Sequence, residues 1–258
     1  MSINKGAIAA QRILEEFGIE NPNDFSVEDL IHARDIILQE KKISNADGRI
    51  VFGKEKTIIS INSEIKYTGR KRFTMAHELG HFELHHNKNT HLEDNSLTLD
   101  YFKNGGQEYE ANQFATELLM PSDLFIRFMR GKSFSPDLLR EIATYFQTSI
   151  TSATYRYLEL GQHPIFLFYS RNKKLIYWKN TSSYFIKVKD ITKLGVPTDS
   201  VAMEFYDDGT IYRKEESKQD IVKSTWFETG EDDSDYEFYE YAIVTKDYNT
   251  VLSVVWEP

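Results

Sequence analysis

Apolar side chains recur every three to four positions through the first 160 residues and then at every second position. The first spacing is that of an α-helix with one buried face, and the second is that of a β-strand with one buried face. The sequence therefore predicts an α+β protein with two domains. Residues 1–162 form a mainly helical domain with one small sheet, and residues 163–258 form a β-rich domain.

Capping residues divide the helical region. Gly18 follows an apolar pattern that ends at Phe17, which predicts the end of a first helix. Ser26 followed by Asp29 resembles a capping box and predicts a second helix that continues through Ile37. Two β-branched runs in residues 49–62 predict a hairpin around Gly53. Further helices are predicted from about residue 68 through the histidine-rich stretch, and at 107–120, 136–146 and 150–160.

The second half of the chain alternates apolar and polar positions in short runs, which predicts strands. Asp208-Gly209 lies between two such runs and indicates a hairpin turn. The predicted strands span residues 164–170, 174–178, 183–188, 201–213, 236–244 and 251–256.

Composition narrows the function. The 258 residues include no cysteine, so the chain has neither disulfides nor thiolate ligands, which agrees with a reducing cytoplasm. The net charge is −9, and the part from Gly161 onward holds 12 Lys/Arg against 17 Asp/Glu, so neither half offers the basic face of a nucleic-acid binder. No apolar run approaches the roughly 20 residues of a membrane span. We expect a cytoplasmic protein without a membrane or nucleic-acid partner.

The stretch TMAHELGHFELHH, residues 74–86, contains four of the seven histidines. His77 and His81 are four residues apart, so on a helix both imidazoles leave the same face and reach one metal ion. Glu78 lies beside that face, where a carboxylate takes a proton from a metal-activated water. This is the logic of the HExxH motif and predicts a catalytic zinc site.

A catalytic zinc needs a third protein ligand and one open position. His85 lies about 12 Å along the helix from His77, which is too far for one metal, and His86 points away. A histidine ten residues after His77 would also serve, but that position is Asn87.

A carboxylate on the helix at 107–120 is the remaining source. Glu108 and Asn112 share a face there, so Glu108 could bind zinc while the Asn112 amide accepts the N–H of a ligating histidine. Ala111 is small enough to let the two helices approach closely. Glu110 and Glu117 are competing ligands, and we expect both to be solvated helix charges.

The segment RKRFTMAHELGHFELHH followed by EYEANQFATELLMP resembles the ImmA/IrrE metallopeptidases, and the likeness covers about residues 5–160. The resemblance implies a gluzincin-like domain in which His77, His81 and Glu108 bind Zn²⁺ and Glu78 is the catalytic base. It also implies a cytoplasmic peptidase that inactivates a helix-turn-helix repressor of mobile-element or stress genes. The β-rich region is then an accessory domain for sensing or for substrate docking.

The group that stabilises the oxyanion is not indicated by these motifs. His91, in the polar loop at 87–106, and Tyr109 are the candidates. The length of that loop suggests a functional lid.

Two other functions compete with the peptidase. Residues 139–160 have helix-turn-helix spacing, which would make the protein a DNA-binding regulator with a structural zinc, but only Arg156 is available to contact DNA and Glu159 opposes it. An antitoxin-like protein would bind a partner through the acidic segment 228–240, which we interpret as a solvated hairpin connection. In the basic run 69–72, we expect Arg72 to be structural and its neighbours to face solvent.

Overall fold

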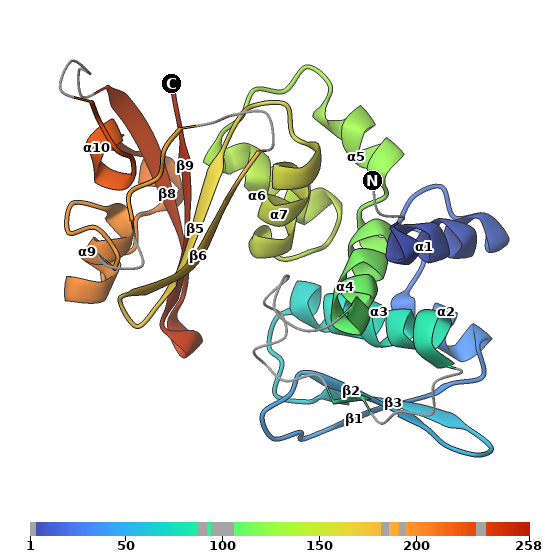
Figure 1. Cartoon of the computed structure of the whole chain (residues 1–258). Helices are drawn as coiled ribbons and strands as arrows, with labels where there is room; N and C mark the ends of the chain where they lie inside the picture. Colours follow the sequence, from blue (N-terminus) through green and yellow to red (C-terminus); the bar gives the residue numbers. More distant parts are fainter. Residues whose placement is uncertain (1–3, 87–91, 94–105, 182–185, 191–194, 231–235) are drawn as a thin grey trace. The chain divides into compact units, whose positions relative to one another are not determined.

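The computed structural model describes residues 4–86, 92–93, 106–181, 186–190, 195–230 and 236–258 (Figure 1). The chain divides into two compact units, each described by itself below. The first unit comprises Met1–Arg130 and Ile142–Ser152, and the second comprises Gly131–Glu141 and Ala153–Pro258. The domain boundary after residue 162 stays a prediction. The fold is α+β, with a helical N-terminal part and a β-rich C-terminal region.

The first unit contains a sheet with strand order β1-β3-β2-β4, in which β1 and β3 are parallel and the other pairs are antiparallel. The predicted hairpin is confirmed, because β2 pairs with β3. The predicted helix through Ile37 is wrong: it ends at Ala33, and Asp35 takes a left-handed conformation with φ 57°. Ile37 then pairs with Ile58, where β-branched side chains fit best. The strands are β1 Ile37–Lys41, β2 Gly48–Phe52, β3 Thr57–Asn62 and β4 Leu92–Glu93.

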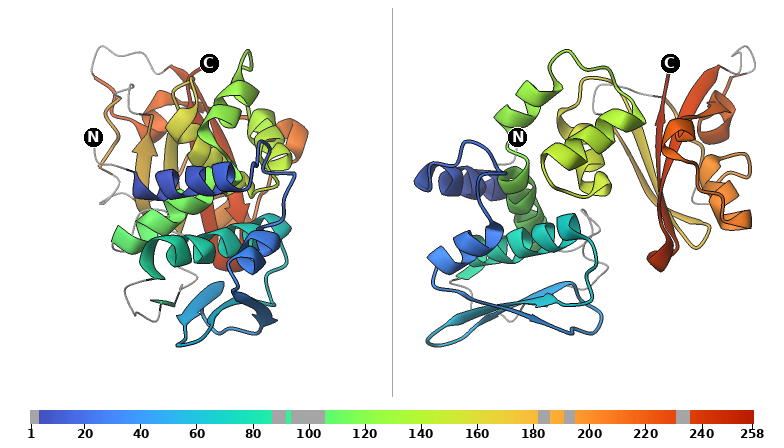
Figure 2. Two further views of the ribbon diagram at one scale, coloured as in Figure 1. Left: turned by 90° about the vertical axis from the view of Figure 1, so that its right-hand side faces the viewer. Right: turned by 180° about the vertical axis from the view of Figure 1, so that it is seen from behind.

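Helix α3 lies across one face of this sheet, against β2 and β3, and packs on its other side against α4 (Figure 2). Two glycines permit the close helix contacts. A Cβ atom on Gly6 of α1 would lie 2.2 Å from the Glu110 carbonyl oxygen, and one on Gly80 of α3 would lie 3.0 Å from the Phe114 ring. Ala111 is fully buried in α4, as a close helix approach requires. The helices are α1 Lys5–Glu16, α2 Val27–Ala33, α3 Thr68–His85, α4 Gly106–Leu119 and α5 Ser122–Met129.

Local signals predicted the end of α1 and the start of α2. The Ser26 side chain accepts from the Asp29 amide, and Gly18 follows α1 with φ 63°. Helix α5 was not predicted, because Pro121 indicates the end of α4 but also precedes the first residue of the next helix.

The basic run at the start of α3 is only partly as predicted. Arg72 is buried and donates to the carbonyls of Pro22 and Phe146, which makes it structural. Arg70 does not face solvent freely. It donates to Asp47 at 2.6 Å, and the side chain is mostly buried. The contact joins α3 to the residue just before β2.

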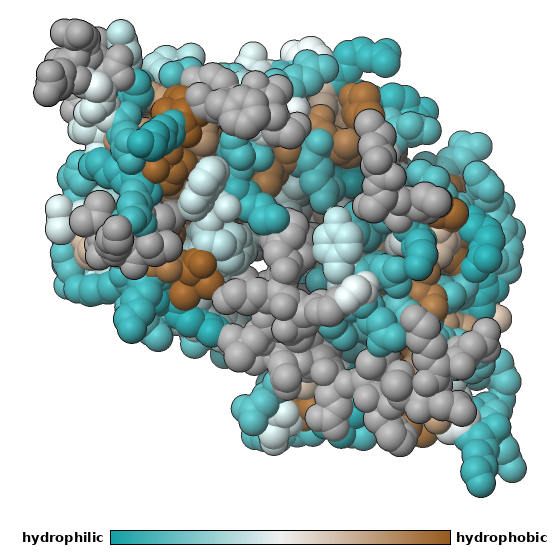
Figure 3. Space-filling view, viewed as in Figure 1, coloured by the Kyte–Doolittle hydropathy of each residue, from teal (hydrophilic) through white to brown (hydrophobic). Residues whose placement is uncertain are grey.

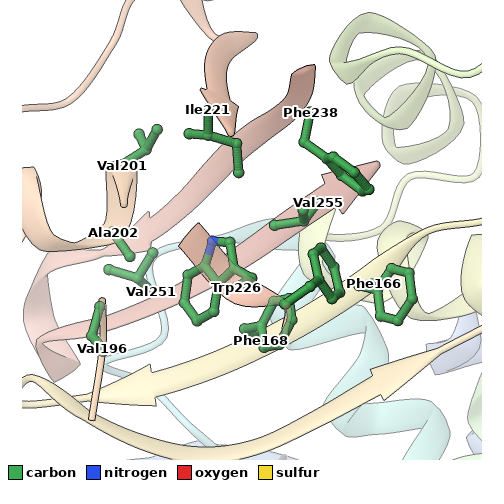
Figure 4. Packing of buried hydrophobic residues seen from close by; sticks show 11 residues of the cluster. Phe166, Phe168, Val196, Val201, Ala202, Ile221, Trp226, Phe238, Val251 and Val255 are labelled. Atoms are coloured by element: carbon green, nitrogen blue, oxygen red, sulfur yellow. The ribbon is translucent and has the colours of Figure 1, made fainter. Parts of the chain in front are cut away.

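The second unit is built on an antiparallel sheet with strand order β6-β5-β9-β8-β7. One face of this sheet carries a cluster of buried aromatic side chains, in which Phe168 stacks on Trp226 at 4.1 Å between ring centroids (Figure 4). Helices α6 Pro136–Tyr145 and α7 Ile150–Leu160 have residues in both units. The other elements of the second unit are β5 Phe166–Arg171, β6 Lys174–Asn180, α9 Val201–Asp208, β7 Gln219–Val222, α10 Lys223–Trp226, β8 Glu237–Thr245 and β9 Thr250–Trp256.

The predicted hairpin at residues 201–213 is wrong, because the first half is helix α9. Ser200 caps its N-terminus by accepting from the Met203 amide, and Gly209 ends it with φ 82°. An Asp-Gly pair serves a helix C-terminus as well as a hairpin, since both need a left-handed residue. Strand β7 and helix α10 were not predicted. Of the predicted strand 183–188, residues 183–185 lie outside the described residues, and Val188 forms an isolated bridge with Phe227.

The aromatic side chains of the second unit are chiefly core. Phe238, Tyr241 and Trp256 are buried with Trp226, whereas Trp178 is 40% exposed. Tyr184 and Phe185 lie outside the described residues. On the face drawn in Figure 3, hydrophobic residues are scattered among hydrophilic ones.

Candidate metal centre

Helix α3 places His77, Glu78 and His81 in the interior of the first unit, and each residue is only 1% exposed. The four-residue spacing stacks the two imidazoles along one helix face. Their Nε2 atoms lie 3.0 Å apart, and their ring centroids lie 4.6 Å apart. Both nitrogens are therefore directed at the same small region.

Glu108, in the first turn of α4, completes this region. Its Oε2 lies 3.3 Å from His77 Nε2, and its Oε1 lies 3.3 Å from His81 Nε2. One ligand atom from each of the three residues lies within 4.8 Å of the others, so among the described residues they form a group that could hold a metal ion. Two imidazole nitrogens and a carboxylate oxygen are a donor set typical of catalytic zinc.

The protonation states of His81 and Glu108 suit a metal. Burial lowers the pKa of His81 to about 4, so its imidazole is neutral at pH 7. Burial alone would raise the pKa of Glu108, but the contacts with His77 and His81 outweigh it and hold that pKa well below the ordinary value. Neutral imidazoles and an ionised carboxylate are the forms that bind metal.

Asn112 lies one turn after Glu108, and its Oδ1 is 2.9 Å from His77 Nδ1. An amide oxygen only accepts, so His77 carries its proton on Nδ1 and presents the Nε2 lone pair to the group. The role of Asn112 beside a metal ligand stays a prediction.

Glu78 packs against the first residue of β2, Gly48. A Cβ atom on Gly48 would lie 2.5 Å from Glu78 Oε1 and 2.6 Å from Thr74 Cγ2. Only glycine leaves this space, so the strand bounds the position of the carboxylate. Sequence analysis did not identify Gly48; a glycine at the start of a β-branched strand was the available signal.

The two competing carboxylates serve other contacts. Glu117 is buried, and it accepts from the Ser122 amide at 3.0 Å and from the Ser122 hydroxyl at 2.8 Å, which holds the start of α5. Glu110 accepts from His85 Nε2 at 3.0 Å and pairs with Lys5 at 3.3 Å. The expectation of a solvated charge was wrong for Glu117, whereas the Glu110 side chain is 24% exposed.

The other two histidines of this stretch, His85 and His86, differ in their exposure. His85 is outside the metal group but buried, and its Nδ1 lies 3.1 Å from His81 Nδ1. His86 is exposed, and its ring contacts Phe52 and Phe82. The contact between His85 and His81 was missed, although an i, i+4 spacing indicates it.

Tyr109 is 47% exposed on α4, and His91 lies outside the described residues, as does most of the loop at 87–106. Their proposed role with the oxyanion stays a prediction. The acidic segment 228–240 is likewise described only in part.

The helix-turn-helix interpretation is weakened by the structure. Arg156 is 4% exposed and pairs with Glu159 at 3.1 Å. A buried, paired guanidinium is not available to a phosphate or a base edge.

None of the helices in the described ranges is long and apolar enough to cross a membrane.

Comparison with known proteins indicates a family and a similar fold. Residues 32–158 match the Peptidase_M78 family model, described as the IrrE N-terminal-like domain. An uncharacterized immunity region protein 2 of Bacillus phage phi105 is 32% identical over 130 residues, which span 50% of this chain and 76% of the phage protein. The fold is similar to that of a Mycobacterium tuberculosis transcriptional regulator, with a TM-score of 0.58 and 12% identity over 99% of this chain and 77% of that one.

Proposed function

Because the chain belongs to the ImmA/IrrE family of metallopeptidases, we propose that it is a zinc-dependent endopeptidase with a gluzincin-like site. The observation that supports this most strongly is the convergence of His77, His81 and Glu108 in the interior of the first unit. In the proposal these three residues bind Zn²⁺, and residues 1–162 form the peptidase domain.

A Zn²⁺ held by these residues would supply Lewis-acid chemistry, activating a water for attack and polarising the scissile carbonyl. In the proposal, side chains of the protein orient a ligand and transfer the proton. Asn112 orients His77 through its Nδ1–H. Glu78 takes the proton of the attacking water and passes it to the leaving amine. The close approach of Gly48 to Glu78 limits the positions that this carboxylate can take.

The proposed substrate is a helix-turn-helix repressor, whose cleavage derepresses mobile-element or stress-response genes. Similarity to an immunity region protein of a phage supports this choice. Such a substrate places the activity in the cytoplasm. Residues 163–258 are then an accessory domain for sensing or for docking the repressor.

The test is a Glu78→Gln variant. Glutamine keeps the size of the side chain but cannot accept the proton, so zinc should stay bound while cleavage falls by at least about 10²-fold. Each protein is expressed with the genes that flank its own, and the neighbouring proteins are examined for one that shortens only with the wild type.

Metal content measured by atomic emission confirms that both proteins are equally loaded, and chelated wild type is the second control. Equal cleavage by both proteins would remove Glu78 as the base. Binding of a repressor without cleavage by either protein would favour the regulator with a structural zinc site.

A further inference from the structure

A chain of buried polar contacts leads away from the metal group. His81 Nδ1 lies 3.1 Å from His85 Nδ1, and His85 Nε2 lies 3.0 Å from Glu110 Oε2. The second oxygen of Glu110 lies 3.3 Å from Lys5 Nζ. The His85 side chain is 0% exposed, that of Glu110 is 24% exposed, and that of Lys5 is 68% exposed. The contacts therefore connect a buried ligand on α3, through α4, to the surface.

The chemistry of these groups sets the direction of each hydrogen bond. An ionised carboxylate only accepts, so His85 must donate its Nε2–H to Glu110. A neutral imidazole with its proton on Nε2 has an acceptor at Nδ1, and that acceptor faces His81. His81 must then carry its own proton on Nδ1. The lone pair of His81 Nε2 is left directed at Glu108 and His77.

We infer that His85 and Glu110 are positioning residues that hold His81 in its metal-binding tautomer and ring orientation. The inference rests on the proposed zinc site. His77 obtains the same result from a single amide, Asn112, whereas His81 obtains it from an imidazole backed by a carboxylate. Partners of this kind change metal affinity by about 10-fold to 100-fold when they are lost.

Two substitutions, His85→Leu and His85→Gln, distinguish a positioning role for His85 from a role in packing alone. His85→Leu keeps an apolar side chain in the buried site but removes both hydrogen bonds. His85→Gln is less suited to an apolar site, but its amide oxygen can accept from His81 while its NH₂ donates to Glu110. If His85 only fills space, leucine is tolerated at least as well as glutamine.

The experiment measures zinc affinity by competition with a chromophoric chelator, using the full chain. We expect His85→Leu to bind zinc about 10-fold to 100-fold more weakly than wild type and His85→Gln to recover to within about 3-fold. His86→Leu is the matched control, because the same change is made one residue away on an exposed side chain, and we expect no change. Thermal unfolding of each metal-free variant shows whether it has folded.

Glu110→Ala tests the outer half of the chain and remains informative if the His85 variants fail to fold. The side chain is partly exposed, so the variant should fold and should bind zinc several-fold more weakly, because His85 is then free to take the other tautomer. Lys5→Ala, which removes an exposed ion pair, should bind like wild type.

The outcomes separate this inference from the proposed function. A wild-type chain that takes up no zinc would overturn both. Wild type that binds zinc while His85→Leu or Glu110→Ala binds equally well would overturn the positioning role alone. So would His85→Leu that binds more tightly than His85→Gln.

Discussion

Replacing Gly48 by alanine should lower the rate of cleavage while leaving zinc affinity nearly unchanged. The added Cβ would lie 2.5 Å from Glu78 Oε1 and 2.6 Å from Thr74 Cγ2. Carbon and oxygen atoms rest about 3.5 Å apart, so the carboxylate must retreat by about 1 Å. A misplacement of about 1 Å can cost about 10²-fold in rate. Gly48 is not one of the proposed metal ligands, so zinc affinity should change by less than about 3-fold.

The same substitution overpacks the contact with Thr74 and should lower the free energy of unfolding by about 1–3 kcal/mol. The two effects can be told apart by adding Thr74→Ser. Serine removes the methyl group but keeps the hydroxyl that donates to the Arg70 carbonyl at 3.0 Å. The double variant should regain stability without regaining activity.

The assay compares kcat/KM for the proposed repressor substrate, zinc affinity and urea unfolding in the wild type, Gly48→Ala and the double variant. Gly106→Ala is the control, because a Cβ atom there meets nothing within 4 Å. Wild-type cleavage by Gly48→Ala would refute the reasoning. Either the strand does not hold Glu78, or Glu78 is not the base.

Four further outcomes are expected. Glu108→Ala should lose most of its zinc, since it removes one of the three proposed ligands, and full occupancy by atomic emission would disprove the assignment. Asn112→Leu should weaken zinc binding by about 10-fold to 100-fold, and unchanged affinity would make Asn112 a packing residue. Glu240→Gln should lower the free energy of unfolding by about 1–3 kcal/mol, and an unchanged urea midpoint would contradict this. The buried carboxylate accepts four hydrogen bonds, and an amide NH₂ cannot replace an acceptor; the donors are the Val201 and Ala202 amides, Trp226 Nε1 and the Ser253 hydroxyl. The free energy of unfolding of the metal-free protein should fall by up to about 3 kcal/mol as the pH falls from 6.5 toward 4. The pKa of His81 is about 4 in the folded state, so over this range the folded state binds fewer protons than the unfolded state. An equal loss in a His81→Gln variant would exclude His81 as the cause.

Local patterns in the sequence determined much of the first unit. The spacing of His77 and His81 placed both imidazoles on one helix face, and the capping signals predicted the end of α1 and the start of α2. These features depend on residues within one or two turns of each other, so their geometry follows from the helix itself. Helical spacing likewise placed Glu108 and Asn112 on one face of α4, although their roles remain predictions.

The tertiary structure decided which partner each side chain meets across the fold. Gly48 is 30 positions before Glu78 in the sequence, and Glu110 is 25 positions after His85. The change from hairpin to helix at α9 has the same origin. Residues 201–208 fit either element locally, and the buried Glu240 of β8 accepts from the first two amides of α9. Contacts of this kind depend on how packed elements approach one another, and a periodicity of two or 3.6 residues carries no information about that approach.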